Sequence, residues 1–580
     1  MNTRSRSFLL FSFLFLLSAV FPSGFSADLS AQDADLILIG ARVWTGEREA
    51  PWAEAVAIRG DRILAVGSRT SVLAHRGSRT QVFDVAGRFI APGFIDNHTH
   101  FSNAGALLLG ANLLAVADAA GLVREVRAAR DRLPAGTWLT GGDWGAYESW
   151  AQGGTGQPGS AQTQRSEFRP QRALIDSITP NSPVLLSKWD RSAYLANARA
   201  ITLAGLACGQ DGVECENGVL TGRLSGAAVN RVRSVMPPKS LEQRLAESRA
   251  ALKHLAELGV TTIHDNTSPE QMEVYQELLR RSELSVRVYA RPTLDKWDEL
   301  RAAGIRHGYG GEWLKIGGLK GFIDGIMGNS SARFYEPYVT TGVRGSWRDM
   351  VTNAPGIERL IFGADSAGHW PQVHAIGDEA IDTLITMFEK VMRTNGPKER
   401  RWRVIHTQVI RNAEVAQRMA RLGLIAEVQP YHAIDDMRWM EERIGPRARW
   451  AYAFKTLQDA GVRLSFGSDW PGTNASWYTA SPLTGMYAAV TRQTLDGKPA
   501  GGWFPQERVD LHTALEAYTV NNAFAAGEEL IKGTLKAGKL ADLVVVDRDP
   551  FRVQPAQLKD LKILLTMVGG RIMFDRRPRS

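Results

Sequence analysis

The chain has 580 residues, of which 44% are hydrophobic and 22% charged, so it can bury a large core and fits a soluble globular protein of two or three domains. This size excludes a small scaffold held together mainly by disulfides. The formal net charge is 69 − 61 = +8, but the basic residues are spread thinly, without a run of five or more like charges. We therefore expect no nucleic-acid partner.

Residues 1–27 have the layout of a secretory signal peptide. Arg4 and Arg6 precede an apolar run over residues 8–20, and small residues follow around Gly24 and Ala27. The apolar run of about 13 residues is shorter than the ~20 needed to cross a bilayer. This favours cleavage over the alternative, an uncleaved anchor, and predicts an exported protein, periplasmic or secreted, without a stable membrane anchor.

Both ends of the mature chain contain short β-like segments bounded by turn residues. They cover residues 34–45, 55–66, 541–547 and 563–568. This distribution predicts one small β domain assembled from residues 28–90 and 531–580, with the middle of the chain inserted between them.

The middle, residues 91–530, alternates short apolar β-like runs with longer helical patterns, which is typical of βα units around a parallel sheet. Candidate strands lie at 94–97, 261–264, 319–323, 372–375, 404–406, 424–428 and 463–466. Further runs at 138–140, 184–186 and 286–290 bring the number above eight. An eight-stranded barrel then requires an insertion after its first strand, which we place at about residues 111–238.

The only two cysteines, Cys208 and Cys215, flank a short glycine-containing loop in this insertion. In an oxidising compartment such a pair is a candidate disulfide. Two free cysteines are the alternative.

The segment 91–100, APGFIDNHTH, is a strand-like run that ends on His98 and His100. Side chains at i and i+2 point the same way at the end of a strand, so both imidazoles can reach one metal ion. Alone, the pair is a weak signal. Further candidate ligands stand at the ends of later predicted strands, namely Lys320, His374, His406 and Asp469.

In a barrel of βα units the carboxyl ends of the strands converge on one face. Each of these residues, taken singly, has an ordinary structural explanation, such as a hydrogen-bonded core histidine or, for Asp469, a turn or helix-capping role. Taken together, their strand-end positions predict one shared site.

These motifs resemble the amidohydrolase superfamily and, within it, amidohydrolase family 3, the YtcJ-like group. The resemblance covers nearly the whole mature chain and rests on GARVWTGE, APGFIDNHTHF, GVTTIHD, LKGFIDG, VHAIGD, VQP, FGSDWP and GKLADLVVVDRDP. It implies an α/β fold, a (β/α)₈ TIM barrel with a small β-sandwich-like domain, and a centre of one or two metal ions.

The resemblance also implies roles for individual residues. His98 and His100 match ligands of a first metal, His374 and His406 match ligands of a second, and Lys320 matches a lysine that bridges both metals once it is carboxylated. Asp469 matches the acid that binds metal and moves the proton, so it is the predicted catalytic residue. Zinc suits imidazole and carboxylate-type ligands, and the same ligands would accept iron, manganese or cobalt.

The chain departs from the family pattern at two places. Many relatives have Gly-His after the aspartate where this chain has Asp190-Arg191-Ser192, so Arg191 or Ser192 substitutes for that histidine or the substrate differs. Arg191 could grip a carboxylate, although a plain surface arginine is the more common case. The second departure is Ile405, which stands where the family has a glutamate before the histidine.

Three tryptophans near predicted strand ends are candidates for an aromatic substrate pocket, and packing is the alternative. They are Trp144, Trp189 and Trp470.

The resulting hypothesis is an exported hydrolase that acts on a non-peptide C–N bond of a small molecule, such as an N-substituted formamide, an N-acyl amine or a cyclic amide. One alternative keeps the site but changes the bond, as in an esterase, lactonase or phosphotriesterase. The other is a non-catalytic binding protein on the same fold, which would have no need of Asp469. The physiological substrate is left open, and a homodimer is compatible with the sequence.

Overall fold

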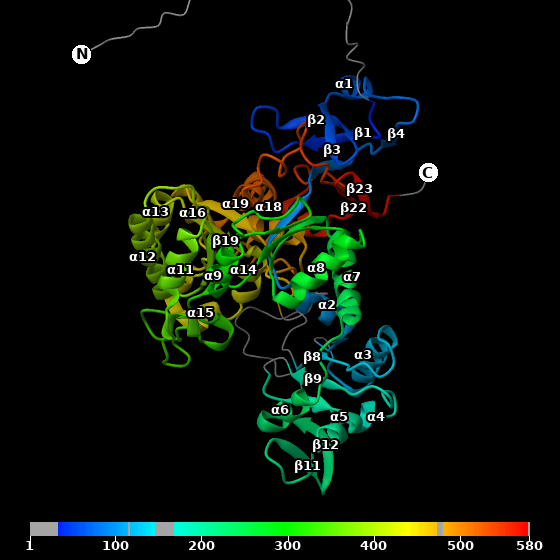
Figure 1. Ribbon diagram of the computed structural model, residues 1–580, viewed down its shortest axis with the longest axis vertical. Coiled ribbons are helices and arrows are strands. Elements are labelled where there is room, and N and C mark those ends of the chain that lie inside the picture. The colour runs from blue at the N-terminus through cyan, green and yellow to red at the C-terminus, as the bar shows by residue number, and fades with distance from the viewer. Residues whose placement is uncertain (1–32, 114–115, 146–167, 189–190, 473–478, 578–580) are drawn as a thin grey trace, which may run out of the picture.

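The computed structural model describes residues 33–113, 116–145, 168–188, 191–472 and 479–577. The predicted signal peptide, residues 1–27, lies outside them. Three regions follow one another along the molecule: a sheet made from both chain ends, a central body of parallel strands and helices, and a smaller sheet with its own helices (Figure 1). In the described part of the chain, no helix combines the length and the apolar character needed to cross a membrane.

The first region is an eight-stranded sheet with the order β23-β22-β21-β5-β1-β2-β3, in which β4 pairs with β1. Strand β5 joins the two ends of the chain, because it pairs in parallel with β1 and antiparallel with β21. The strands are β1 (Leu36–Trp44), β2 (Trp52–Arg59), β3 (Arg62–Gly67), β4 (Gln81–Asp84), β5 (Phe89–Pro92), β21 (Leu543–Val546), β22 (Ile563–Val568) and β23 (Arg571–Asp575), and helix α1 (Arg69–Leu73) follows β3.

The β-like segment expected at 55–66 is a hairpin of β2 and β3 rather than one strand. The chain reverses at Gly60, whose φ of 57° lies in the left-handed region that glycine adopts at little cost. Gly569 and Gly570, with φ of 55° and 70°, make the corresponding turn between β22 and β23.

The central body contains two parallel sheets, β15-β14-β13-β6 and β16-β17-β18-β19-β20. Only Gly317 and Gly318 separate β15 from β16, and isolated parallel bridges link Thr293 with Lys320 and Thr99 with Trp470. This is a TIM-barrel-type α/β fold. The strands are β6 (Phe94–Thr99), β13 (Val260–Asn266), β14 (Arg287–Arg291), β15 (Leu314–Ile316), β16 (Leu319–Phe322), β17 (Pro371–Ala375), β18 (Arg403–His406), β19 (Ile425–Val428) and β20 (Arg463–Phe466).

Helices cover these strands on the outside (Figure 1). They are α2 (Phe101–Leu109), α7 (Leu241–Glu257), α8 (Pro269–Arg280), α9 (Trp297–Ala302), α10 (Asp349–Thr352), α11 (Ile357–Ser366), α12 (Asp378–Asn395), α13 (Ala413–Arg421), α14 (Pro430–Asp436), α15 (Met440–Ile444), α16 (Phe454–Asp459), α17 (Pro482–Thr491), α18 (Leu511–Tyr518) and α19 (Val520–Ala526). Strands β17, β18 and β19 are buried along their whole length. Parallel strands covered by helices lie inside the core in this way, so their ends hold side chains in constrained positions.

Between α2 and α7 the chain forms a six-stranded sheet of its own, with the order β11-β12-β10-β9-β8-β7, which we call the insertion sheet. Of the three additional runs predicted above, 184–186 falls in this sheet and 286–290 in β14 of the central body, while 138–140 directly precedes β8. The strands are β7 (Ala111–Asn112), β8 (Gly141–Trp144), β9 (Leu185–Lys188), β10 (Tyr194–Ala196), β11 (Val213–Glu216) and β12 (Val219–Leu224), with helices α3 (Ala119–Arg132), α4 (Ala173–Asp176), α5 (Ala198–Leu203) and α6 (Gly226–Ser234).

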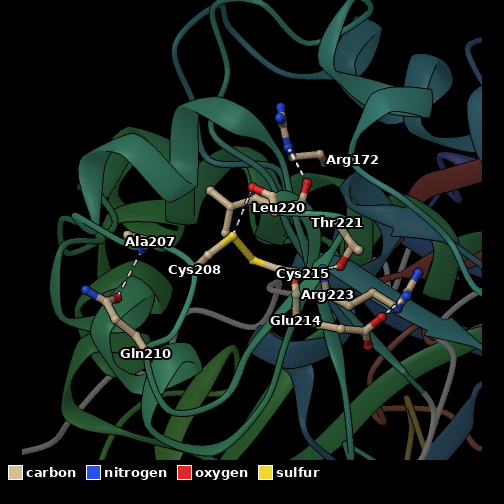
Figure 2. Close-up of a disulfide and its surroundings, with 10 residues drawn as sticks. Arg172, Ala207, Cys208, Gln210, Glu214, Cys215, Leu220, Thr221 and Arg223 are labelled. Atoms are coloured by element: carbon tan, nitrogen blue, oxygen red, sulfur yellow. Dashed lines mark hydrogen bonds and ion pairs between the residues drawn. A yellow bond between two sulfur atoms is a disulfide. The ribbon is translucent and has the colours of Figure 1, made fainter.

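Cys208 forms a disulfide with Cys215, which lies in β11 of the hairpin made by β11 and β12 (Figure 2). The hairpin lies at the end of the molecule farthest from the sheet made by the chain ends (Figure 1).

Candidate metal centre

Five of the six candidate ligands stand near or just beyond the carboxyl ends of central strands, whereas Lys320 is the second residue of β16. His98 lies in β6 with His100 directly after it, Lys320 lies in β16 and His374 in β17, His406 ends β18, and Asp469 follows β20. In this fold type those strand ends share one face of the molecule.

The side chains converge around the carboxylate of Asp469. Its Oδ1 lies 3.3 Å from Nε2 of His98 and 3.1 Å from Nε2 of His100. Ligand atoms of His98, His406 and Asp469 all lie within 4.8 Å of one another, so one ion can contact all three. Lys320 Nζ is 3.3 Å from His98 Nε2, and the rings of His374 and His406 have centroids 4.6 Å apart.

Three of the histidines use one ring nitrogen for a protein partner. His98 Nδ1 lies 2.7 Å from Glu427 Oε1, His406 Nδ1 lies 2.7 Å from Gln429 Oε1, and His374 Nε2 lies 2.9 Å from the Gly325 carbonyl. Each contact orients its ring and leaves the second nitrogen for a metal, which is the usual arrangement of metal-binding histidines.

The protonation of the histidines also fits a metal site. Burial and the nearby Lys320 hold the pKa of His98 well below its usual value and lower the pKa of His374 to about 3. Burial likewise lowers the pKa of His406. The three imidazoles are therefore neutral, with a free electron pair for a divalent cation, and Asp469 supplies the anionic oxygen.

Beneath His98, the carboxylate of Glu427 is held by two arginines. Arg291 Nη1 donates to Oε1 at 2.8 Å and Arg403 Nη1 donates to Oε2 at 2.8 Å, and all three side chains are fully buried. Burial acts to raise the pKa of Glu427, but Arg291 and the contact with His98 lower it well below its usual value. An ionised Glu427 therefore accepts a hydrogen bond from Nδ1–H of His98, which leaves Nε2 directed toward Asp469.

Lys320 is almost completely buried. Burial, followed by the repulsion of Arg291, lowers the pKa of its ammonium group to about 7. Near neutral pH a large fraction of this side chain is the uncharged amine, which is the form that reacts with carbon dioxide to give a carbamate.

Two candidate ligands have left-handed backbones, with φ of 71° at His406 and 57° at Asp469. Non-glycine residues rarely adopt this conformation, and it persists only where surrounding contacts impose it. For Asp469 these contacts come from the first strand: its amide donates to the His98 carbonyl at 2.9 Å, and Asp96 Oδ1 accepts from the amide of the neighbouring Ser468 at 3.0 Å. The first and last strands thus hold the predicted catalytic acid between them.

A cavity of about 690 Å³ opens beside His100 and Asp469. Its opposite wall comes from the insertion, and the cavity is large enough for a small-molecule substrate. The residues that line it are His100, Asn103, Ala106, Leu107, Thr140, Gly141, Leu185, Ser187, Arg191, Tyr194, Arg233, Met236, Asp469, Pro471 and Gly472.

The predicted substrate-binding residues have different surroundings. Arg191 lines the cavity, whereas Trp470 is fully buried with its ring stacked on His254 of α7, and Trp144 is buried in the core of the insertion. For these two tryptophans the structure gives the packing arrangement that was the alternative in the sequence analysis. Trp189 and Asp190 lie outside the described residues.

Four residues behind the ligands were not predicted from the sequence, namely Glu427, Arg291, Arg403 and Gln429. It also missed Asn266 at the end of β13, whose Nδ2 lies 3.0 Å from His98 Nε2 and 3.2 Å from His100 Nε2. A signal was available, because Arg291, Arg403 and Glu427 are charged residues within short, otherwise mostly apolar strands. Charges rarely stand at such positions unless they are paired.

The sequence model of the amidohydrolase family matches residues 81–574. The chain is 30% identical over 561 residues to protein LONG AFTER FAR-RED 3 of Arabidopsis thaliana, covering 93% of this chain and 92% of that protein. It is 27% identical over 574 residues to the N-substituted formamide deformylase of Arthrobacter pascens, covering 94% and 99%. Among solved structures, an uncharacterized metal-dependent hydrolase from Pyrococcus furiosus matches with a TM-score of 0.69 at 26% identity, covering 89% of this chain and 100% of that one.

Together, the TIM-barrel-type fold and these matches define a metal-dependent hydrolase. The chain belongs to the amidohydrolase family, which confirms the resemblance found in its sequence.

Proposed function

We propose that this protein is exported and hydrolyses the C–N bond of N-substituted formamides or closely related N-acyl amines, with a divalent metal held by His98, His100, Lys320, His374, His406 and Asp469. The observation that carries the proposal is the convergence of His98 and His406 on Asp469, which lines a cavity of about 690 Å³. The overall similarity to a formamide deformylase, at 27% identity over 94% of the chain, supports the substrate class.

A divalent ion held by these residues would acidify a water molecule and polarise the carbonyl oxygen of the amide. The protein's own residues transfer the protons. Asp469 lies within hydrogen-bonding distance of two histidines and at the cavity wall, so its carboxylate can take the proton from the attacking water and pass it to the leaving nitrogen. Water adds to the carbonyl carbon, the C–N bond breaks, and the products are the free amine and formate or another carboxylate.

Zinc is the metal we propose, because neutral imidazoles and an anionic oxygen suit it. We further propose that Lys320 is carboxylated. The lowered pKa of its amine, about 7, supports this modification, and the resulting carbamate would be an anionic oxygen ligand in place of a poorly coordinating ammonium group. Export is supported by the basic and apolar N-terminal segment, residues 1–27.

The test combines metal analysis of the mature protein with a screen of N-formyl amines, N-acyl amines, esters and lactones. We expect about one or two equivalents of zinc per chain and turnover of the formyl or acyl amines, lost on chelation and restored by added zinc. Mass spectrometry of intact protein before and after mild acid, which releases a carbamate as carbon dioxide, checks Lys320. Turnover of esters alone, or protein without bound metal, would overturn the proposal.

A further inference from the structure

The cavity beside the candidate metal centre has two unlike walls. His100 and Asp469 belong to the central body, whereas Arg191, Tyr194 and Arg233 belong to the insertion. Apolar side chains make up much of the remaining lining, among them Leu107, Leu185 and Met236. A substrate with its amide at Asp469 therefore extends along apolar surface toward arginine side chains.

The positive charge of Arg191 is already compensated. Its guanidinium pairs with the carboxylate of Asp143, which is buried, and Nη1 also donates to Ser187 Oγ at 2.8 Å and to the Lys188 carbonyl at 2.9 Å. Burial raises the pKa of Asp143, and the charge of Arg191 opposes that shift. Arg191 therefore stabilises a buried acid, and its charge is poorly placed to select an anionic substrate.

Arg233, near the end of α6, has different partners. Its Nη2 donates to the hydroxyl of Tyr194 at 2.7 Å, and its guanidinium carbon lies 5.0 Å from the centroid of the Tyr194 ring. Within the part of the chain that the structure describes, no carboxylate pairs with Arg233. The buried Tyr194 thus positions a cation at the cavity while leaving its charge uncompensated.

From this arrangement we infer that Arg233, positioned by Tyr194, binds a carboxylate at the far end of the substrate. The substrate class is then an N-formyl or N-acyl amine whose amide and carboxylate are separated by an apolar segment. This inference rests on the proposed function, since it names the substrate class of the same site. Arginine suits the role because its planar guanidinium offers several donors to a carboxylate.

The first experiment uses the metal-loaded wild-type enzyme and two matched series of substrates. One series contains N-formyl-ω-aminoalkanoates of increasing chain length, and the other contains N-formylalkylamines of the same lengths without the carboxylate. We expect kcat/KM to favour the acid by about tenfold to a hundredfold at the best length, the range of one charge-assisted hydrogen bond. The preference should fall as salt is added.

The second experiment compares Arg233→Gln with Arg231→Gln. Arg231 lies on the same helix and is also exposed, but it donates to the Gly205 carbonyl and does not line the cavity. Both variants remove one charge from α6. We expect Arg233→Gln to reduce the acid-to-neutral ratio of kcat/KM about tenfold or more, whereas Arg231→Gln should keep the wild-type ratio. Tyr194→Phe should lower the ratio by a smaller factor, because it removes the hydroxyl and keeps the ring.

The outcomes separate the two proposals. If no formamide or N-acyl amine is hydrolysed, the proposed function itself fails. If neutral amides are hydrolysed but the wild-type enzyme shows no preference for the acids, the carboxylate site is wrong whatever the variants do. Equal ratios for Arg233→Gln and Arg231→Gln would likewise overturn it, and a folding defect in Arg233→Gln leaves the wild-type comparison and Tyr194→Phe as tests.

Discussion

The ligand cluster and the insertion wall of the cavity face the same space but are built in opposite ways. Behind His98 the charged groups Glu427, Arg291 and Arg403 are fully buried and paired with one another inside the protein. On the insertion wall the arginines are exposed and held by a few contacts to neighbouring side chains or carbonyls. Buried pairing constrains the reactive groups, whereas exposed contacts can change without loss of the fold. We therefore assign the chemistry to the first region and substrate choice to the second.

The strongest test of the buried side is Asp469→Asn. The amide keeps the size of the side chain but cannot accept and return a proton, so we expect kcat on a formamide to fall by about two to four orders of magnitude. Kinetics of metal-loaded protein measure the fall, and elemental analysis measures the metal. Asp459→Asn is the control, because Asp459 is an exposed acid on α16. Activity of Asp469→Asn close to wild type would refute the proposed proton transfer.

The second test replaces Glu427 by glutamine. Two buried arginines then lose their shared carboxylate, and His98 loses its anionic partner. We expect a loss of about 3–5 kcal/mol in the free energy of unfolding, because one partner of a buried ion pair is removed. Metal affinity should fall about 10- to 100-fold.

Denaturant unfolding of the metal-free protein measures the first effect, and competition with a chelator measures the second. Glu414→Gln, at an exposed position of α13, is the matched control. If the Glu427 variant were as stable as this control, the buried charges would not hold the site together.

These two residues also show what the sequence could and could not predict. Asp469 was recognisable because it belongs to FGSDWP and follows a predicted strand, so motif and position agreed. Glu427 stands within β19, in the four residues IAEV, where an acid in an apolar strand indicates a buried pairing but does not identify the partners. Its role depends on arginines from β14 and β18, and that pairing exists only once the sheets have assembled.

The central strands and the residues of the cavity wall also differ in how far they could be predicted from the sequence. The central strands were predictable because each is a short apolar run between turn and helical signals. The tryptophans were not, because proximity to a strand end does not determine the direction of a side chain: Trp470 faces His254 in the core, away from the cavity. Arg233 gave no signal at all, since an exposed arginine on a helix is the commonest case on a protein surface.

A third test concerns pH and the buried region behind His406. Asp436 is a buried acid whose Oδ2 accepts from Gln408 Nε2 at 2.8 Å and from the Tyr452 hydroxyl. Burial, with the negative charge of Asp435 adding to it, raises its pKa to about 8. The folded protein therefore favours the protonated form of Asp436, and this preference adds to the free energy of unfolding. The added stability is complete below the unfolded pKa of about 4 and is lost as the pH rises toward 8.

Asp436→Asn, which is neutral at every pH, should remove this dependence. We expect the free energy of unfolding of wild type to fall relative to that of the variant between pH 4 and 8. The stability of the variant relative to wild type is therefore highest at the alkaline end of this range. Urea unfolding across the pH range measures the difference. Parallel curves for the two proteins would show that Asp436 is ionised in the folded state.

The smallest effect is expected on the insertion side, from removal of the disulfide. Cys208 and Cys215 are seven positions apart, so the bond closes a short loop and restricts the unfolded chain only modestly, by about 2–3 kcal/mol in the loop-entropy treatment. The paired variant Cys208→Ser, Cys215→Ser should therefore loosen the β11–β12 hairpin, seen as faster hydrogen exchange over residues 205–224. Because this hairpin lies at the end of the molecule farthest from the sheet made by the chain ends (Figure 1) and none of its residues lines the cavity, kcat/KM for neutral amides and the metal content should match wild type. A large loss of either would mean that the insertion supports the metal centre directly. The assignment of chemistry to the ligand cluster and of substrate choice to the insertion wall would then be wrong.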